Sequence, residues 1–203
     1  LVHAYHQMYV HEPDQYKLAF GNNVLGCWCW ARGAQGASCT PASWMNFVHA
    51  SLAKHGVLFC PDFHVSDLES NDYLDFDTDD NGNFVLDDKG KRIPSPQGYA
   101  RCYTDDLAII SANSTEHRRA WRHIIKVLKH VRLKISPEKT KIGLKYMNFL
   151  GHCVSPDVTF ANLSKVEGIQ NIAGPSLANP WSKTDVRSWC GAVSFYRCYI
   201  PAF

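Results

Sequence analysis

The chain has 203 residues, of which 45% are hydrophobic and 20% charged, and its formal net charge is +2. These values describe an ordinary globular protein of one large or two small domains. No apolar run approaches the ~20 residues that cross a bilayer, so we expect no membrane partner. No secretory signal follows Leu1, and a start at Leu rather than Met predicts a piece of a longer protein.

The charges are unevenly distributed along the chain. Residues 62–92 hold ten of the 19 acidic residues but three of the 21 basic ones, which leaves 18 basic against 9 acidic residues elsewhere. Within 117–145, ten Lys and Arg residues face the single acid Glu138. The sequence is therefore a basic module interrupted by an acidic insert (residues 62–98), which indicates a phosphate-rich partner.

The eight cysteines form no Cys-x-x-Cys pair. Cys27 and Cys29 flank Trp28 and would share one face of a strand, which is a weak zinc signal. We expect buried free thiols in a reducing compartment rather than disulfides or zinc.

Residues 1–56 are expected to form strands followed by one helix. β-prone residues occur at Tyr5, over 8–10, over 16–20 and over 24–30. A loop of small residues, 33–38, then leads into a helical pattern that starts at Pro41 and ends at Gly56. Its apolar positions are Trp44, Phe47, Val48 and Leu52. A small-residue loop before a helix can approach a phosphate closely.

The acidic insert carries two turn signals, Asn81-Gly82 and Lys89-Gly90, which predict an exposed hairpin. An alternative is that residues 77–88 form an EF-hand calcium loop, with Gly82 at position 6 and Asp88 at position 12. Asp in place of the usual Glu, and prolines soon after it, argue against calcium.

Three Asp-Asp pairs occur, at 79–80, 87–88 and 105–106, and only the last lies between core-like residues. Tyr103 precedes Asp105 and Asp106, and an apolar run from Leu107 follows them. This pattern predicts a tight hairpin with both acids at its tip. Two like charges in such a place need a cation, and hard oxygen ligands suit Mg²⁺.

Ser114 or Thr115 is expected to cap a helix with one apolar and one basic face. The apolar stripe comprises Trp121, Ile124, Ile125 and Leu128. The basic face comprises Arg118, Arg119, Arg122, Lys126 and Lys129. Contact with nucleic acid and simple solvation are equally good interpretations of the basic face.

The last third of the chain is predicted to alternate short strands with two helices. A strand is expected over 133–135, a turn over 136–139 and a strand pair over 149–154. Capping boxes starting at Ser164 and Ser182 would open the helices, the first of which must stop before Pro175. The second helix carries an apolar side formed by Val186, Trp189, Val193 and Tyr196.

Taken in order, these segments resemble the reverse transcriptase of gypsy-type long-terminal-repeat retrotransposons and, more distantly, of retroviruses. The matching segments are 1–8, 36–44, 103–107, 133–139, 149–152 and 186–201. The resemblance implies an α+β fold, the right-hand polymerase palm, with an antiparallel sheet backed by helices over residues 1–155. Residues 156–203 would begin the thumb or connection region.

The resemblance also implies an RNA-directed DNA polymerase that uses two Mg²⁺ ions, or Mn²⁺ in their place. Asp105 and Asp106 would be catalytic metal ligands. Lys139, with Lys141 in reserve, would protonate the departing pyrophosphate as a general acid.

The remaining expected site residues bind nucleotide and primer. Tyr5 would exclude a 2′-hydroxyl, and Gln35, Gly36 and Tyr103 would contact the incoming dNTP. The expected primer grip consists of Leu150 and Gly151. Partners would be an RNA or DNA primer–template and the rest of the Pol polyprotein, including RNase H and integrase, in a cytoplasmic retroelement particle or the nucleus.

The sequence departs from the family pattern in three places. The family's first catalytic Asp immediately precedes the residue that matches Leu1, Met45 stands where a Gln is expected, and the acidic insert is extra. We therefore expect the isolated fragment not to polymerise. The alternative function is a degenerate or domesticated derivative that binds nucleic acid or a protein without catalysis.

Overall fold

A computed structural model describes the whole chain except residues 23, 25, 59–71, 171–173 and 175–179. It contains two compact units, Leu1–Lys141 and Ile142–Phe203, and each is described by itself. The domain boundary predicted after residue 155 stays a prediction.

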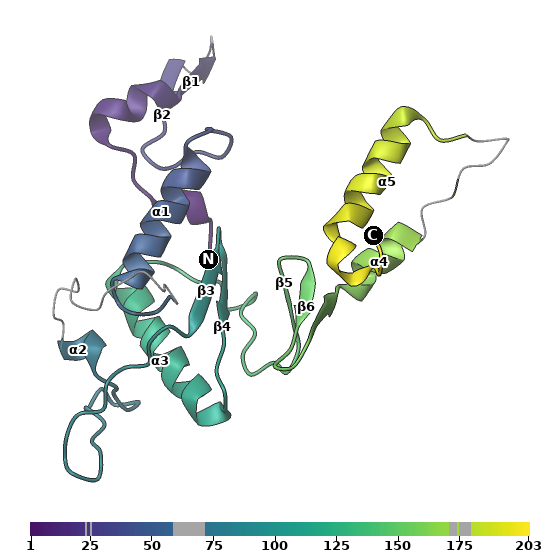
Figure 1. Cartoon of the computed structure of the whole chain (residues 1–203). Coiled ribbons are helices and arrows are strands. Elements are labelled where there is room, and N and C mark those ends of the chain that lie inside the picture. Colours follow the sequence, from purple (N-terminus) through teal and green to yellow (C-terminus); the bar gives the residue numbers. More distant parts are fainter. Residues whose placement is uncertain (23, 25, 59–71, 171–173, 175–179) are drawn as a thin grey trace. The chain divides into compact units, whose positions relative to one another are not determined.

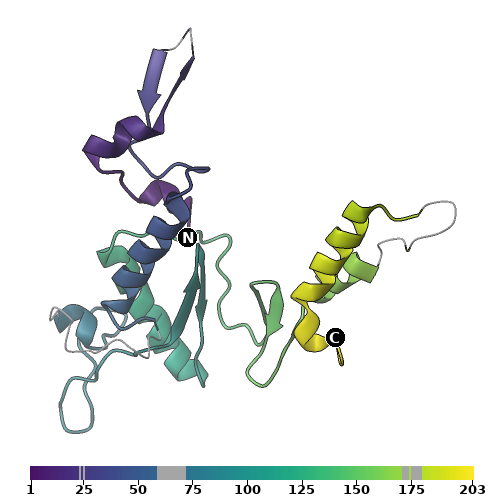
Figure 2. The same ribbon diagram turned by 45° about the horizontal axis from the view of Figure 1, so that its top comes forward.

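In the first unit, two helices back an antiparallel hairpin. Helices α1 (Thr40–Ala53) and α3 (Ser114–His130) lie side by side on one face of β3 (Ala100–Tyr103) and β4 (Asp106–Ile109), as Figures 1 and 2 both show. The core they enclose consists of Trp44, Val48, Leu52, Val57, Leu74, Tyr99, Ala100, Ala120, Ile124, Val127, Leu128 and Leu133. The predicted α+β class, with an antiparallel sheet backed by helices, is confirmed.

The two backing helices follow the predicted periodicity, with small differences at their edges. In α1, Trp44, Val48 and Leu52 are buried, whereas Phe47 is 38% exposed. The predicted cap of α3 is wrong, because Asn113 accepts a hydrogen bond from Glu116 N at 2.9 Å, which places Ser114 inside the first turn.

The first twenty residues are mostly helical rather than extended, which corrects the prediction of strands there. They form two 3-10 helices, η1 (Ala4–Gln7) and η2 (Glu12–Leu18). Pro13 is the second residue of η2, where its fixed φ suits a helical turn. A hairpin follows from β1 (Ala19–Asn22) and β2 (Gly26–Cys29), and all of β2 is exposed.

The acidic insert contains α2 (Asp72–Asp75) and then two consecutive turns, not one exposed hairpin. Three of its backbone segments form a closed ring of hydrogen bonds. Val85 N donates to Asp77 O at 3.0 Å, Ile93 N to Val85 O at 2.9 Å, and Asp77 N to Ile93 O at 2.8 Å. Asp77, Val85 and Ile93 are eight residues apart in sequence, so the second turn has the same length and the same hydrogen bonding as the first.

Each turn of the insert is closed by an aspartate. Asp79 Oδ1 accepts from the backbone N of Asn81 and Asn83, each at 2.9 Å. Asp87 Oδ1 accepts in the same way from Lys89 N and Lys91 N. The turn signals in the sequence are therefore confirmed, although the hairpin built from them is not.

The second unit is a three-stranded antiparallel sheet followed by helices. Its strands are β5 (Met147–Phe149), β6 (His152–Val154) and β7 (Thr159–Ala161), which confirms the predicted strand pair. Its helices are α4 (Leu163–Gln170), α5 (Lys183–Phe195) and η4 (Arg197–Tyr199).

The caps and buried faces of these helices agree in part with those predicted from the sequence. The capping box at Ser182 forms with Asp185. At α4 the Asn162 side chain accepts from Ser164 N at 3.1 Å, so the predicted cap is shifted by two residues. Tyr196, just after α5, is buried, but Val186 is 43% exposed.

The seven described cysteines are free thiols. None of these seven is buried, which corrects the expectation of buried thiols; Cys27 and Cys29, for example, are exposed. Among the described residues, no helix combines the length and apolarity that a membrane span requires.

Candidate active site

The β3–β4 hairpin places Asp105 in its turn and Asp106 at the start of β4, so the expectation of both acids at the tip holds for Asp105 alone; α1 contacts this turn through two side chains. Tyr103 pairs with Asp106, which leaves Thr104 and Asp105 as a two-residue turn. Thr104 has φ 53, a left-handed conformation that is uncommon for a β-branched residue. Trp44 Nε1 donates to Thr104 O at 2.8 Å, and Thr104 N donates to Met45 Sδ at 2.8 Å.

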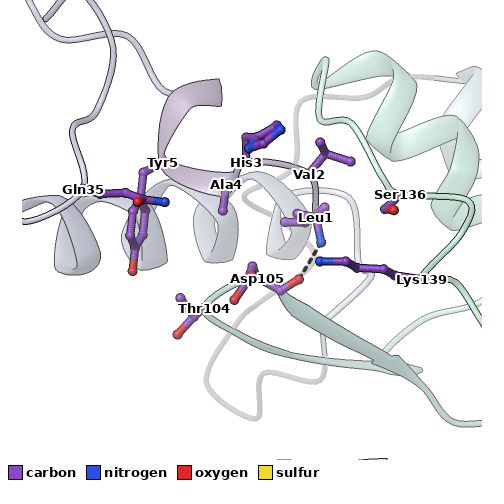
Figure 3. A pocket seen from close by; sticks show the side chains of 10 residues that line it. All are labelled: Leu1, Val2, His3, Ala4, Tyr5, Gln35, Thr104, Asp105, Ser136 and Lys139. Atoms are coloured by element: carbon purple, nitrogen blue, oxygen red, sulfur yellow. Dashed lines mark hydrogen bonds between the residues drawn. The ribbon is translucent and has the colours of Figure 1, made fainter.

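This turn borders a pocket of about 420 Å³ (Figure 3). Four segments that are distant in sequence contribute its lining. The lining residues are Leu1, Val2, His3, Ala4, Tyr5, Gln35, Thr104, Asp105, Ser136 and Lys139. The pocket therefore joins the matched segments 1–8, 103–107 and 133–139 with Gln35, the residue just before the matched segment 36–44.

Four predicted site residues line this pocket. Tyr5 and Gln35 lie toward one end, and Lys139 extends from the other side toward Leu1 and Asp105 (Figure 3). The Tyr5 ring meets Trp44 edge to face, with centroids 6.4 Å apart, so the same helix fixes both the ring and the acidic turn.

Three other predicted residues adjoin the pocket without being among its described lining residues. Asp106 opens β4, and Tyr103 ends β3 with an exposed ring. Gly36 follows Gln35 and has φ 91, a conformation that favours glycine.

Asp105 and Asp106 suit a hard cation held by few protein ligands. Both are exposed, and neither forms an ion pair with a Lys or Arg in the part of the chain that the structure describes. Mg²⁺ commonly binds one or two carboxylates and completes its shell with water and substrate phosphates. Within the described ranges no three His, Cys, Asp or Glu residues gather around one point, so a metal here would depend on such additional ligands.

The acids of the possible calcium loop have other partners. Asp77 pairs with Arg119 Nε at 2.7 Å, and Asp80 pairs with Arg122 Nε at 2.7 Å. Asp79 and Asp87 close their own turns. These contacts occupy carboxylates that a calcium ion would otherwise take as ligands.

Lys139 lies on a turn that its own neighbours stabilise. Ser136 Oγ donates to Glu138 Oε2 at 2.8 Å, and Thr140 N donates to Pro137 O at 3.1 Å. The strand predicted just before it, over 133–135, does not form. At Lys134 the backbone N donates to a side chain, Gln7 Oε1, instead of to a neighbouring strand.

The predicted primer grip, in the second unit, is the turn between β5 and β6. Leu150 has φ 50 and Gly151 has φ 81, as a two-residue hairpin turn requires. Tyr196 donates its hydroxyl to Gly151 O at 2.8 Å, and a Cβ at Gly151 would meet the Phe195 ring at 3.1 Å. The turn is thus fixed, and it presents Leu150, which is 40% exposed.

Some lining residues were not predicted from the sequence. Val2, His3, Thr104 and Ser136 lie inside the matched segments, but no individual signal marks them. Proximity to a predicted site residue is the signal that could have found them.

The sequence model of a family described as "Reverse transcriptase (RNA-dependent DNA polymerase)" matches residues 1–154. The chain is 34% identical over 101 residues to the "Retrovirus-related Pol polyprotein from transposon gypsy" of Drosophila melanogaster, which covers 50% of this chain and 9% of that protein. It is 21% identical over 198 residues to the transposon Tf2-3 polyprotein of Schizosaccharomyces pombe, which covers 98% of this chain and 11% of that protein. The chain thus spans about a tenth of the length of these relatives.

Solved structures share the fold of the whole chain. A foamy viral protease–reverse transcriptase dRH in complex with dsDNA has a TM-score of 0.71 at 18% identity, covering 100% of this chain and 27% of that one. A foamy viral protease–reverse transcriptase in complex with an RNA/DNA hybrid has a TM-score of 0.66 at 18% identity and covers 97% of this chain and 20% of that one. These neighbours support the predicted polymerase palm fold.

Proposed function

Because the chain belongs to the reverse transcriptase (RNA-dependent DNA polymerase) family, we propose that it forms part of the active site for RNA-directed DNA synthesis in a retrotransposon polyprotein. One observation carries this proposal. The pocket brings Tyr5, Gln35, Asp105 and Lys139 together from four sequence-distant segments.

Asp105 and Asp106 would hold the divalent cations, for which Mg²⁺ is the first candidate. When bound, the metal would neutralise charge on the reacting phosphates. Lys139 extends toward Asp105 from the far side of the pocket and would donate a proton to the departing pyrophosphate.

The sugar and base of a dNTP would occupy the Tyr5 end of the pocket. Gln35 and Gly36 would contact the nucleotide. The space beside Gly36 is open, since a Cβ added there would meet no atom within 4 Å, and a nucleotide could therefore approach the backbone. Tyr103 would lie beside the site at the end of β3. Leu150 and Gly151 would contact the primer strand of an RNA or DNA primer–template.

The first segment lies against the acidic turn, because Leu1 N donates to Asp105 O at 2.6 Å (Figure 3). RNase H and integrase segments are proposed as further parts of the same polyprotein.

Primer extension tests the proposal. The longer reading frame that contains this chain should extend a DNA primer on an RNA template in the presence of Mg²⁺. Asp105→Asn should reduce extension by roughly a thousandfold or more, because a neutral amide binds the cation weakly. Asp88→Asn, in the other part of the unit, should leave extension unchanged.

Equal extension by the Asp105→Asn variant and the parent would refute the role of Asp105. If the parent binds the primer–template but extends no primer under any metal condition, the non-catalytic alternative is correct instead.

A further inference from the structure

We propose that Gln7 is a positioning residue that ties the two walls of the pocket together and acts on the reaction through Lys139. This inference rests on the proposed polymerase function. It assigns a role to a side chain that lies outside the pocket lining.

The side-chain amide of Gln7 joins its own segment, at Val2, to Lys134, which lies 127 residues after Gln7. Its Oε1 accepts from Lys134 N at 2.6 Å, and its Nε2 donates to Lys134 O at 3.2 Å. The same Nε2 donates to Val2 O. A primary amide offers two donor hydrogens on its nitrogen and one acceptor oxygen, and here both the nitrogen and the oxygen of Gln7 form hydrogen bonds.

A backbone hydrogen bond completes this bridge. Val2 N donates to Lys134 O at 3.0 Å, so Gln7 and Val2 both contact the peptide units of Lys134. This closed arrangement takes the place of the strand pairing that residues 133–135 do not form. The amide therefore substitutes for the edge of a neighbouring strand.

The bridge is connected to two walls of the pocket. Val2 belongs to one wall, and Ser136, two residues after Lys134, begins the turn that carries Lys139 on the other wall. That turn is internally braced by the Ser136–Glu138 hydrogen bond. A displacement of Lys134 would therefore move Lys139 with the turn rather than be absorbed within it.

The test variant is Gln7→Glu, which preserves side-chain size but replaces both donor hydrogens with an oxygen. That oxygen would face the carbonyl groups of Val2 and Lys134, so the two walls should separate. The matched control is Gln15→Glu. Gln15 lies in η2 and donates to Val10 O at 3.2 Å, outside the pocket.

In the active longer reading frame, Gln7→Glu should lower kcat/KM for dNTP by roughly tenfold or more, with the primer–template Kd unchanged. Gln15→Glu should change kcat/KM less than about twofold. Because Gln7 acts through Lys139, its effect should shrink to about threefold or less in a Lys139→Met background. Parental kinetics in Gln7→Glu, or an undiminished effect beside Lys139→Met, would overturn the proposal.

The bridge is also measurable without catalysis, in the present chain. Amide hydrogen exchange at Lys134 should be roughly tenfold faster in Gln7→Glu and unchanged in Gln15→Glu. Unchanged exchange at Lys134 in Gln7→Glu would refute the bridge itself. If the longer reading frame does not polymerise, the proposed function fails together with the kinetic role of Gln7, and the exchange result still decides whether the bridge exists.

Discussion

Tyr5 shows how one side chain can be positioned by another residue's packing. Its ring lines the pocket and packs edge to face on the fully buried Trp44. A ring anchored in this way can exclude an additional hydroxyl group, because it cannot move aside without disturbing the core.

Tyr5→Ala in the active reading frame should therefore raise ribonucleotide incorporation by roughly tenfold or more relative to deoxynucleotides. Competitive incorporation of rNTP and dNTP into a labelled primer measures this ratio. Tyr16→Ala, an exposed tyrosine in η2, is the control and should leave the ratio unchanged. Unaltered sugar selectivity in Tyr5→Ala would contradict the role given to this ring.

His123 is a buried titratable residue in the core of the first unit. Burial lowers the pKa of His123 from 6.5 to about 4, and its Nδ1 lies 2.9 Å from the Tyr99 hydroxyl. The folded protein therefore contains neutral His123 throughout the physiological range.

This shift makes stability depend on pH in a definite direction. Between pH 6.5 and 4 the unfolded chain binds a proton that the folded chain does not, so the free energy of unfolding falls as pH falls. Between pH 7.5 and 5 the loss should be about 2 kcal/mol. Urea denaturation at both pH values measures it, with His123→Gln as a non-titrating control. If His123→Gln has the same pH slope as the parent, His123 is not its source.

At the scale of elements, the acidic insert packs on the basic face of α3. Arg119 and Arg122 pair with Asp77 and Asp80, and Arg119 also donates to Pro94 O at 3.0 Å. From the sequence, this basic face was expected either to contact nucleic acid or to be solvated. Neither interpretation included a partner within the chain. The insert thus neutralises part of the charge that the sequence offered to nucleic acid.

The two ion pairs allow a matched comparison. Both have N–O distances of 2.7 Å, but the Asp77 side chain is 3% exposed and that of Asp80 is 83% exposed. Arg119→Met should destabilise the unit by about 3 kcal/mol, because it leaves a buried carboxylate without its cation. Arg122→Met should cost less than about 1 kcal/mol. Equal losses in urea denaturation would show that burial of Asp77 does not govern the pair.

At the scale of the whole molecule, an excess of basic residues surrounds the insert, with 18 Lys and Arg against 9 Asp and Glu outside residues 62–92. If three to four Lys or Arg side chains contact phosphates, raising the salt concentration from 50 to 200 mM should weaken primer–template binding on the order of 100-fold. Fluorescence anisotropy with a labelled duplex measures this change. Binding that is independent of salt would contradict a charge-based interface.

Local chemistry alone determined several features of this protein. The Tyr103–Asp106 hairpin, the buried stripe of α1, the capping box at Ser182 and the turns of the insert were all predictable. Each depends on residues within a few positions of one another, whose periodicity or hydrogen bonding specifies the backbone. The order of matched segments likewise indicated the palm fold and the acids of the site.

Tertiary structure decided the features that depend on partners distant in sequence. Residues 133–135 looked like a strand, but the amide of Gln7 occupies the backbone groups of Lys134. Arg119 looked available to nucleic acid, but Asp77, 42 residues earlier, occupies it. No local pattern encodes these contacts, because hydrogen bonds and ion pairs between distant segments exist only after the core has brought those segments together.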